Sequence, residues 1–241
     1  MQEVGRMFEH RKKLMYEVKV SQADPRFAKL LLEQFGGANG ELAAAMQYFV
    51  QGLGCRDAKM RDMFMDIATE EISHLEMVGT CIDMLIKGHP NEEYYESELF
   101  DVVGGNGPNL MNSHGVKWTA DYLKVSGELA SDLLNDIAAE GRAKITYERL
   151  ISQTDDPLVI DTLKFLMTRE VTHIRNFQEA LYTLEEQMPG TMAGTPEFVR
   201  KYYNMSTGET DARGPWNAAD TFEYIESPEP MGNNPAAEFK N

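Results

Sequence analysis

The sequence has few cysteines, a shortage of basic side chains and no long apolar run, and each deficit excludes a class of protein. Cys55 and Cys81 are too few for a disulfide framework or a thiolate zinc site. The sequence has 23 Lys and Arg residues and 39 Asp and Glu residues, and the resulting net charge of -16 disfavours nucleic acid and anionic membranes as partners. No segment reaches the roughly 18 apolar residues of a membrane span, and Met1–Lys13 has no apolar core like that of a signal peptide. We therefore expect a cytoplasmic protein in which carboxylates and imidazoles would hold any metal.

Apolar residues at helical spacing predict four long helices with recognisable ends. The four segments are Asp24–Gly54, Asp57–Lys87, Trp118–Gln153 and Pro157–Gln187. The first contains Gly36, Gly37 and Gly40, which predict close backbone packing or a kink just before Glu41. The glycines and proline of residues 91–116 predict a long irregular crossover between the second and third helices.

The lengths of the connections indicate the fold. Short first and last connections with one long crossover describe a ferritin-like four-helix bundle, which is an all-α fold. We therefore predict a bundle domain at residues 1–188 and an extended, irregular C-terminal arm at residues 189–241. The arm holds six of the ten prolines, which prevents a long fifth helix. Such an arm wraps its own bundle or a neighbouring subunit, and a disordered terminus is the alternative.

An internal repeat relates the two helical hairpins at an offset of 99 residues. In an alignment with this offset, Glu41 matches Glu140, Glu71 matches Glu170, and His74 matches His173. Neighbouring positions agree in part, including Tyr48 with Tyr147 and a Thr-x-Glu-x-x-His motif in both hairpins. A duplicated helix pair is a simple way to build such a bundle, so the repeat supports the predicted fold.

The spacing within each hairpin predicts a metal site. The single Glu and the Glu-x-x-His motif are equally far apart in both hairpins, which puts them at one height in antiparallel helices. One Glu-x-x-His motif alone usually marks a solvated helix face, but six matched groups would cost too much to bury without a cation. Four carboxylates and two imidazoles suit a dinuclear manganese or iron centre. His10, His89 and His114 lie outside this pattern, and we expect them on the surface or in loops.

Three segments carry a resemblance to a known family. The segments Gly36–Glu41, Thr69–Met77 and Lys164–His173 resemble motifs of the manganese catalases, including spore-coat members, and the similarity covers about Met7–Leu184. The resemblance implies that Glu71 bridges two manganese ions, that Glu41 and His74 bind one of them, and that Glu140 and His173 bind the other. It also implies that Glu170 lies beside the metals without binding them.

The resemblance further implies a calcium ion and a hexamer. The matching calcium ligands are Asp62, Asp66, Asn204, Ser206 and Gly208. Asp62 and Asp66 share a helix face, and oxygen donors suit a hard cation, although a solvated acidic face explains these two residues as well. In the hexamer the C-terminal arm would clasp a neighbour. Ala139 stands where some members of the family have an arginine beside the active site, so substrate access would differ.

The function implied by the resemblance is the disproportionation of hydrogen peroxide to water and oxygen by a dimanganese catalase. Glu170 would act as the general base and acid, and Tyr48 would donate a hydrogen bond to a ligand carboxylate or to the backbone. Two alternatives remain open at this point. One is a di-iron ferritin-like or rubrerythrin-like peroxidase or ferroxidase, because manganese and iron share these ligands. The other is a spore-coat structural protein with a residual metal site.

Overall fold

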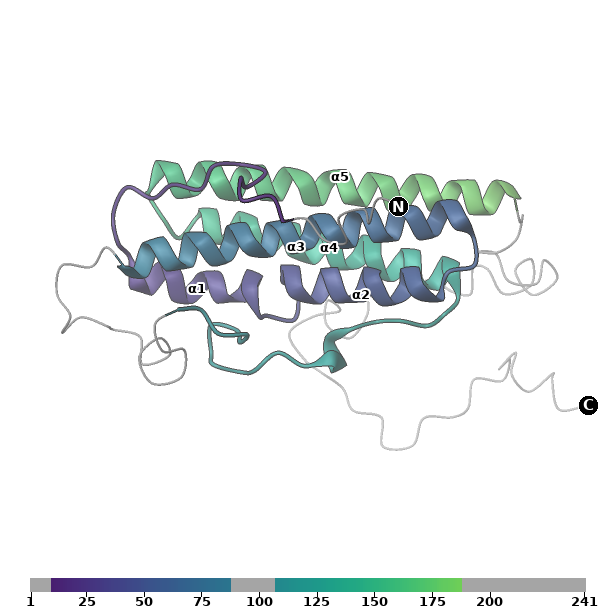
Figure 1. The fold of residues 1–241 in the computed structure, drawn as a ribbon, viewed down its shortest axis with the longest axis horizontal. Helices are drawn as coiled ribbons and strands as arrows, with labels where there is room; N and C mark the ends of the chain where they lie inside the picture. Colours follow the sequence, from purple (N-terminus) through teal and green to yellow (C-terminus); the bar gives the residue numbers. More distant parts are fainter. Residues whose placement is uncertain (1–9, 88–106, 188–241) are drawn as a thin grey trace, which may run out of the picture. The chain divides into compact units, whose positions relative to one another are not determined.

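A computed structural model describes residues 10–87 and 107–187, and these ranges form a helical bundle. The helices are α1 (Pro25–Phe35), α2 (Glu41–Gly54), α3 (Ala58–Lys87), the 3-10 turn η2 (Ala120–Tyr122), α4 (Leu129–Ile151) and α5 (Pro157–Gln187). Figure 1 shows α1 and α2 following one another along one side of the bundle. Helix α3 packs against both of them, and α4 packs against α5. The predicted four-helix bundle is confirmed, whereas the arm at residues 189–241 lies outside the described residues.

The first predicted helix is divided in two at its glycines. Helix α1 ends at Phe35, and a Cβ atom added to Gly36 would lie 2.3 Å from the backbone nitrogen of Met111. The crossover segment therefore passes directly over the break, and only glycine leaves room for it. Helix α2 then begins at Glu41 with Gly40 as its N-cap. The close backbone packing expected before Glu41 is present, but the prediction of one continuous helix over Asp24–Gly54 is wrong, because the chain forms two helices there.

The third helix begins later than the sequence pattern predicted. The predicted start at Trp118 is wrong, because α4 begins at Leu129 and the residues before it contain only the turn η2. Gly127 has a φ of 76°, a left-handed conformation that interrupts a right-handed helix. The backbone nitrogen of Lys124 donates to Gln47 Oε1 at 2.8 Å. This segment therefore bonds to α2 instead of forming a helix of its own.

Two separate apolar cores fill the bundle. One joins α1 to the C-terminal half of α3 and the N-terminal half of α5, and the fully buried Leu31, Ile82 and Leu166 belong to it. The other lies at the opposite end and includes Phe64 of α3 and Phe177 of α5. Within α3 and α5, the predicted metal-binding positions fall between the residues of these two cores. The cores therefore enclose a polar layer from both ends.

The described helices differ from membrane-spanning segments in their composition. None of these helices combines the length and the apolar character that crossing a bilayer requires. The cytoplasmic location expected from the sequence stays a prediction.

Candidate metal centre

The six residues related by the 99-residue offset meet in the polar layer between the two cores. They are Glu41 of α2, Glu71 and His74 of α3, Glu140 of α4, and Glu170 and His173 of α5, and all six are buried. We call them the centre. Their potential ligand atoms form two groups in which all atoms lie within 4.8 Å of one another. The groups are Glu41, Glu71, His74 and Glu170, and Glu71, Glu140, Glu170 and His173.

Glu71 lies between the two histidines. Its Oε2 atom is 3.0 Å from His74 Nδ1, and its Oε1 atom is 2.7 Å from His173 Nδ1. One carboxylate thus presents an oxygen to each half of the centre. Glu170 is positioned differently, because its Oε1 atom lies 3.7 Å from His74 Nδ1 and neither of its oxygens has a hydrogen-bond partner among the described residues. The two glutamates are equivalent in the repeat but not in their surroundings.

The two outer glutamates are held by tyrosines from the opposite hairpin. Tyr48 of α2 donates its hydroxyl hydrogen bond to Glu140 Oε1 of α4 at 2.6 Å. Tyr147 of α4 donates in return to Glu41 Oε1 of α2. Both rings are fully buried. Each hydrogen bond fixes the orientation of a carboxylate and leaves its second oxygen for another partner.

The buried negative charges of the centre favour the binding of a cation. Burial raises the pKa of Glu170 well above its usual value, and the charges of Glu71 and Glu140 add to this effect. Burial and the charges of Glu140 and Glu41 raise the pKa of Glu71 to about 8. Burial alone would lower the pKa of His74, but the charge of Glu71 and contacts with Glu41 raise it. Four buried carboxylates therefore repel one another, and bound cations would remove that penalty.

The donor atoms fit manganese or iron. Glu140 Oε2 and both oxygens of Glu170 are buried without a hydrogen-bond partner among the described residues. Neither cysteine belongs to the two groups, so the donors available are carboxylate oxygens and imidazole nitrogens. Donors of this type, delivered by four facing helices, match dinuclear carboxylate centres.

The remaining predicted residues are only partly described. Asp62 and Asp66 are exposed and line a pocket of about 440 Å³ on the surface of α3. Asn204, Ser206 and Gly208 lie outside the described residues. Ala139 of α4 is half-buried next to Glu140. His10 is exposed with its Nε2 atom 3.1 Å from Glu76 Oε1, and His114 lies in a loop, whereas His89 lies outside the described residues.

Sequence reasoning missed two residues that contact the centre, Tyr147 and Glu70, and a third, Arg169, that bonds to Glu70. Tyr147 bonds to Glu41, and Glu70 lies against both histidines with Arg169 beside it. The 99-residue offset contained the signal, because it pairs Tyr147 with Tyr48 and Arg169 with Glu70. What the sequence could not reveal is that the tyrosines bond across the two hairpins rather than within one.

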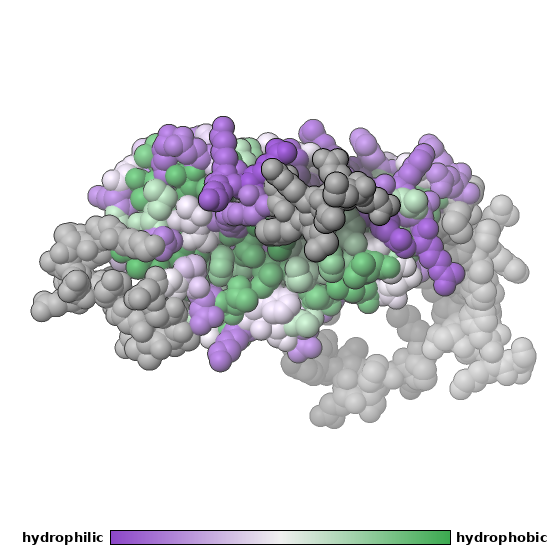
Figure 2. All heavy atoms as spheres, in the orientation of Figure 1, coloured by the Kyte–Doolittle hydropathy of each residue, from purple (hydrophilic) through white to green (hydrophobic). Residues whose placement is uncertain are grey.

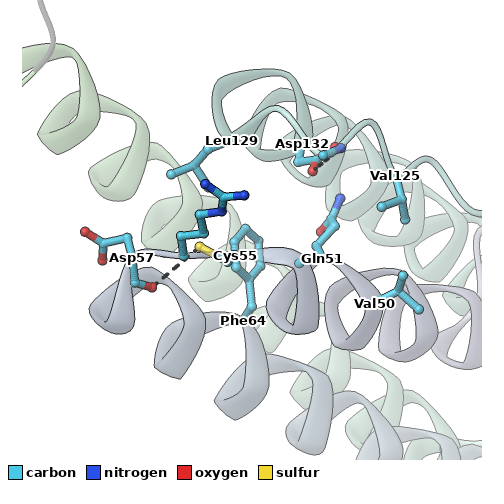
Figure 3. Close-up of a pocket in the computed structure, with 11 residues that line it drawn as sticks. Val50, Gln51, Cys55, Asp57, Phe64, Val125, Leu129 and Asp132 are labelled. Carbon is cyan, nitrogen blue, oxygen red and sulfur yellow. Dashed lines mark hydrogen bonds between the residues drawn. The ribbon is translucent and has the colours of Figure 1, made fainter.

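A cavity of about 480 Å³ is lined in part by the turn between α2 and α3, and none of the six residues of the centre lines it. Figure 3 shows Gln51 of α2 extending toward the part of α4 that carries Asp132. Gln51 Nε2 donates to Asp136 Oδ1 at 2.9 Å, and Gln47 Nε2 donates to the same oxygen at 2.8 Å. Because Asp136 lies one helical turn before Glu140, a polar strip of α4 runs from this cavity toward the centre.

Fold and centre together define a ferritin-like bundle with a carboxylate and histidine metal site. The family model of the manganese containing catalases matches residues 7–240. The chain belongs to this family, as its three motifs predicted. A probable manganese catalase from Clostridium acetobutylicum is 41% identical over 213 residues, which cover 83% of this chain and 91% of that protein. Protein CotJC of Bacillus subtilis is 43% identical over 183 residues, which cover 75% of this chain and 96% of that protein.

Solved structures agree with the sequence comparison. KatB, a manganese catalase from Anabaena PCC7120, matches with a TM-score of 0.74 and 43% identity over 92% of this chain and 100% of its own. Bacterioferritin from Rhodobacter capsulatus has a TM-score of 0.52 and 20% identity over 70% of this chain and 92% of its own, and it shares the fold alone. The ferritin-like architecture is therefore confirmed, and the family match favours manganese catalase over the two alternatives.

Proposed function

We propose that this protein disproportionates hydrogen peroxide to water and oxygen at a pair of manganese ions bound by the centre. One observation carries the proposal: six buried carboxylate and imidazole groups meet in one layer of a protein that belongs to the manganese catalase family. Manganese would supply redox chemistry between its divalent and trivalent states, so that one peroxide is reduced, the next is oxidised and no outside reductant is needed.

The geometry supports a division of the ligands into two halves. Glu71 would bridge the two ions, because its two oxygens face different histidines at 3.0 and 2.7 Å. Glu41 and His74 would complete one half, and Glu140 and His173 the other. Two divalent ions carry four positive charges against three negative charges of Glu41, Glu71 and Glu140. The small positive excess would favour binding of an anionic ligand at the centre.

Glu170 is the residue best placed to handle protons. Both of its oxygens are buried and have no hydrogen-bond partner among the described residues, so either can accept a proton or return it. Peroxide reduction consumes protons and peroxide oxidation releases them, so one carboxyl group can serve both halves of the cycle. The apolar cores on either side keep bulk water from competing for these protons.

Metal analysis combined with an oxygen electrode tests the function. The protein is produced in manganese-supplemented and in iron-supplemented medium, and oxygen release from peroxide is measured without a reductant. We expect the manganese-loaded protein to release oxygen with about two manganese ions per chain, as the two ligand groups imply. Activity that requires iron, or that requires an added electron donor, would replace this proposal with the di-iron alternative.

Calcium binding and assembly are further parts of the proposal. Asp62 and Asp66 line one acidic pocket, which supports their role as calcium ligands together with Asn204, Ser206 and Gly208. Apolar side chains gather in the middle of the face shown in Figure 2. Helix α2 also exposes Phe49, Val50 and Leu53, and such surfaces often form subunit contacts. Together with the family resemblance, this supports a hexamer, which sedimentation analysis would test.

A further inference from the structure

Glu70 and Arg169 occupy equivalent positions in the two hairpins and carry opposite charges. Each directly precedes a glutamate of the centre, and they are separated by the same 99 residues that relate the rest of the repeat. The structure joins them across the bundle. Arg169 Nε donates to Glu70 Oε1 at 2.6 Å, and Arg169 Nη2 donates to Glu70 Oε2 at 3.3 Å. Two parallel hydrogen bonds fix the plane of the carboxylate.

The same two oxygens of Glu70 face both histidines of the centre. Glu70 Oε1 lies 3.4 Å from His74 Nε2, and Glu70 Oε2 lies 3.4 Å from His173 Nε2. The two imidazole rings are stacked with their centroids 5.7 Å apart, so one carboxylate can span them. Neither Nε2 atom has a hydrogen-bond partner of good geometry among the described residues. Glu70 is therefore the carboxylate that faces both Nε2 atoms, whereas Glu71 faces both Nδ1 atoms.

We propose that Glu70, held in place by Arg169, positions both metal-binding histidines at once. A neutral imidazole has one N–H group and one lone pair. If each Nε2–H points toward Glu70, each Nδ1 lone pair points into the centre, where Glu71 already lies within 3.0 Å of both Nδ1 atoms. A carboxylate that accepts the outer N–H also makes the inner nitrogen a better electron donor to a metal.

The shared acceptor has a consequence that two separate acceptors would not have. Because one side chain restrains both rings, its loss should weaken both metal positions together rather than one of them. Glu70 also lines the surface pocket that contains Asp62 and Asp66. Glu70, which restrains the histidines, is therefore accessible from the protein surface, whereas the histidines themselves are fully buried.

Manganese affinity, measured by competition with a chelator, tests the positioning role. Glu70→Gln removes the charge, and Glu70→Asp keeps the charge but withdraws the carboxylate by one methylene group. Both variants should bind manganese about 10–100-fold more weakly at both positions. The electron paramagnetic resonance spectrum of the manganese-loaded protein should change as well. Glu76→Gln removes one charge from an exposed part of the same helix and is the matched control.

The variant Arg169→Gln distinguishes the effect of the Glu70 carboxylate from the effect of its ion pair with Arg169. This variant breaks the same pair but leaves Glu70 beside the histidines, so its affinity should fall less than that of Glu70→Gln. Equal losses in the two variants, or an unchanged affinity in both Glu70 variants, would overturn the proposal. If Glu70→Gln does not fold, Glu70→Asp decides the question.

The inference rests on the proposed function only for the identity of the metal. Manganese affinity and the resonance spectrum do not require turnover. An unmodified protein that binds manganese but releases no oxygen would therefore contradict the proposed function and leave the role of Glu70 to be judged on affinity alone.

Discussion

Tyr48 and Tyr147 lie 99 residues apart, and each donates a hydrogen bond to a glutamate in the opposite hairpin. The bonds cross between α2 and α4, so each hairpin orients a ligand that the other supplies. The 99-residue offset relates the Tyr48–Glu140 pair to the Tyr147–Glu41 pair, with the two hairpins exchanged. The exchange ties the two halves of the centre into one unit, and neither half can be displaced without disturbing the other.

Replacing either tyrosine with phenylalanine should weaken metal binding. Tyr48→Phe and Tyr147→Phe each remove a hydrogen bond to a buried carboxylate, and we expect a loss of about 10–100-fold in manganese affinity or turnover. Tyr182→Phe is the control, because Tyr182 is 68% exposed on α5. Chelator competition and oxygen release measure the effect. Equal values for the variants and the control would show that the hydroxyl groups do not support the centre.

Glu170→Gln should separate metal binding from turnover. The amide preserves the shape of the side chain but cannot accept and return a proton as a carboxylate does. We expect both metals to remain and oxygen release to fall by about 10²–10⁴-fold. Metal content and oxygen release are measured on the same sample. Full activity in this variant would remove Glu170 from the proposed mechanism.

His74→Ala should lose manganese, whereas His10→Ala should retain it. His74 is fully buried and supplies one Nδ1 atom to the centre, but His10 is exposed and pairs with Glu76. Metal analysis of the two purified variants gives the comparison. A fully occupied site in His74→Ala would contradict the ligand assignment.

Gly36→Ala and Gly141→Ala should change stability in opposite directions. A Cβ atom on Gly36 would lie 2.3 Å from the backbone nitrogen of Met111, and backbone cannot move aside easily. We expect a loss of about 1–3 kcal/mol in the free energy of unfolding. Gly141 lies inside α4 with nothing within 4 Å of its added Cβ, so alanine there should contribute up to about 1 kcal/mol. Urea unfolding measures both variants, and a stable Gly36→Ala would show that the crossover can shift.

Asp156 should stabilise the protein only above acidic pH. Its carboxylate accepts hydrogen bonds from Ser21 N at 2.7 Å and from Leu158 N at 3.0 Å, where it caps α5. Burial raises the pKa of Asp156, but the bonds from Ser21 outweigh this and lower it below the usual value. The stabilisation is therefore present above about pH 4, the pKa expected in the unfolded chain, and is lost as the pH falls through the lower folded value.

The variant Asp156→Ala tests this dependence. It should cost about 1 kcal/mol at neutral pH, as other N-cap losses do. The difference from the unmodified protein should shrink below about pH 4, which urea unfolding at several pH values would detect. A difference that is the same at acidic and neutral pH would show that the charge of Asp156 is not involved.

The centre was predictable from the sequence because its spacing repeats. Glu41 and Glu71 are as far apart as Glu140 and Glu170, and helical geometry converts that spacing into a shared height. The start of α4 was not predictable, because the segment before it bonds to distant residues of α2: Lys124 N donates to Gln47 Oε1, and Gln51 Nε2 donates to the carbonyl oxygen of Lys124. Local helical pattern is a weak guide wherever tertiary contacts offer the backbone other partners.

Because α1 and α2 are separate helices, Glu41 and its counterpart Glu140 have different electrostatic surroundings. Glu41 is the first residue of α2, where Gly40 offers no capping side chain and the free N–H groups carry a partial positive charge of about half an elementary charge. Its counterpart Glu140 lies well inside α4, away from either helix end. A cation beside Glu41 therefore meets a carboxylate whose charge is already partly balanced. Two ions of one element would then bind with different strengths, and the two positions would fill one after the other.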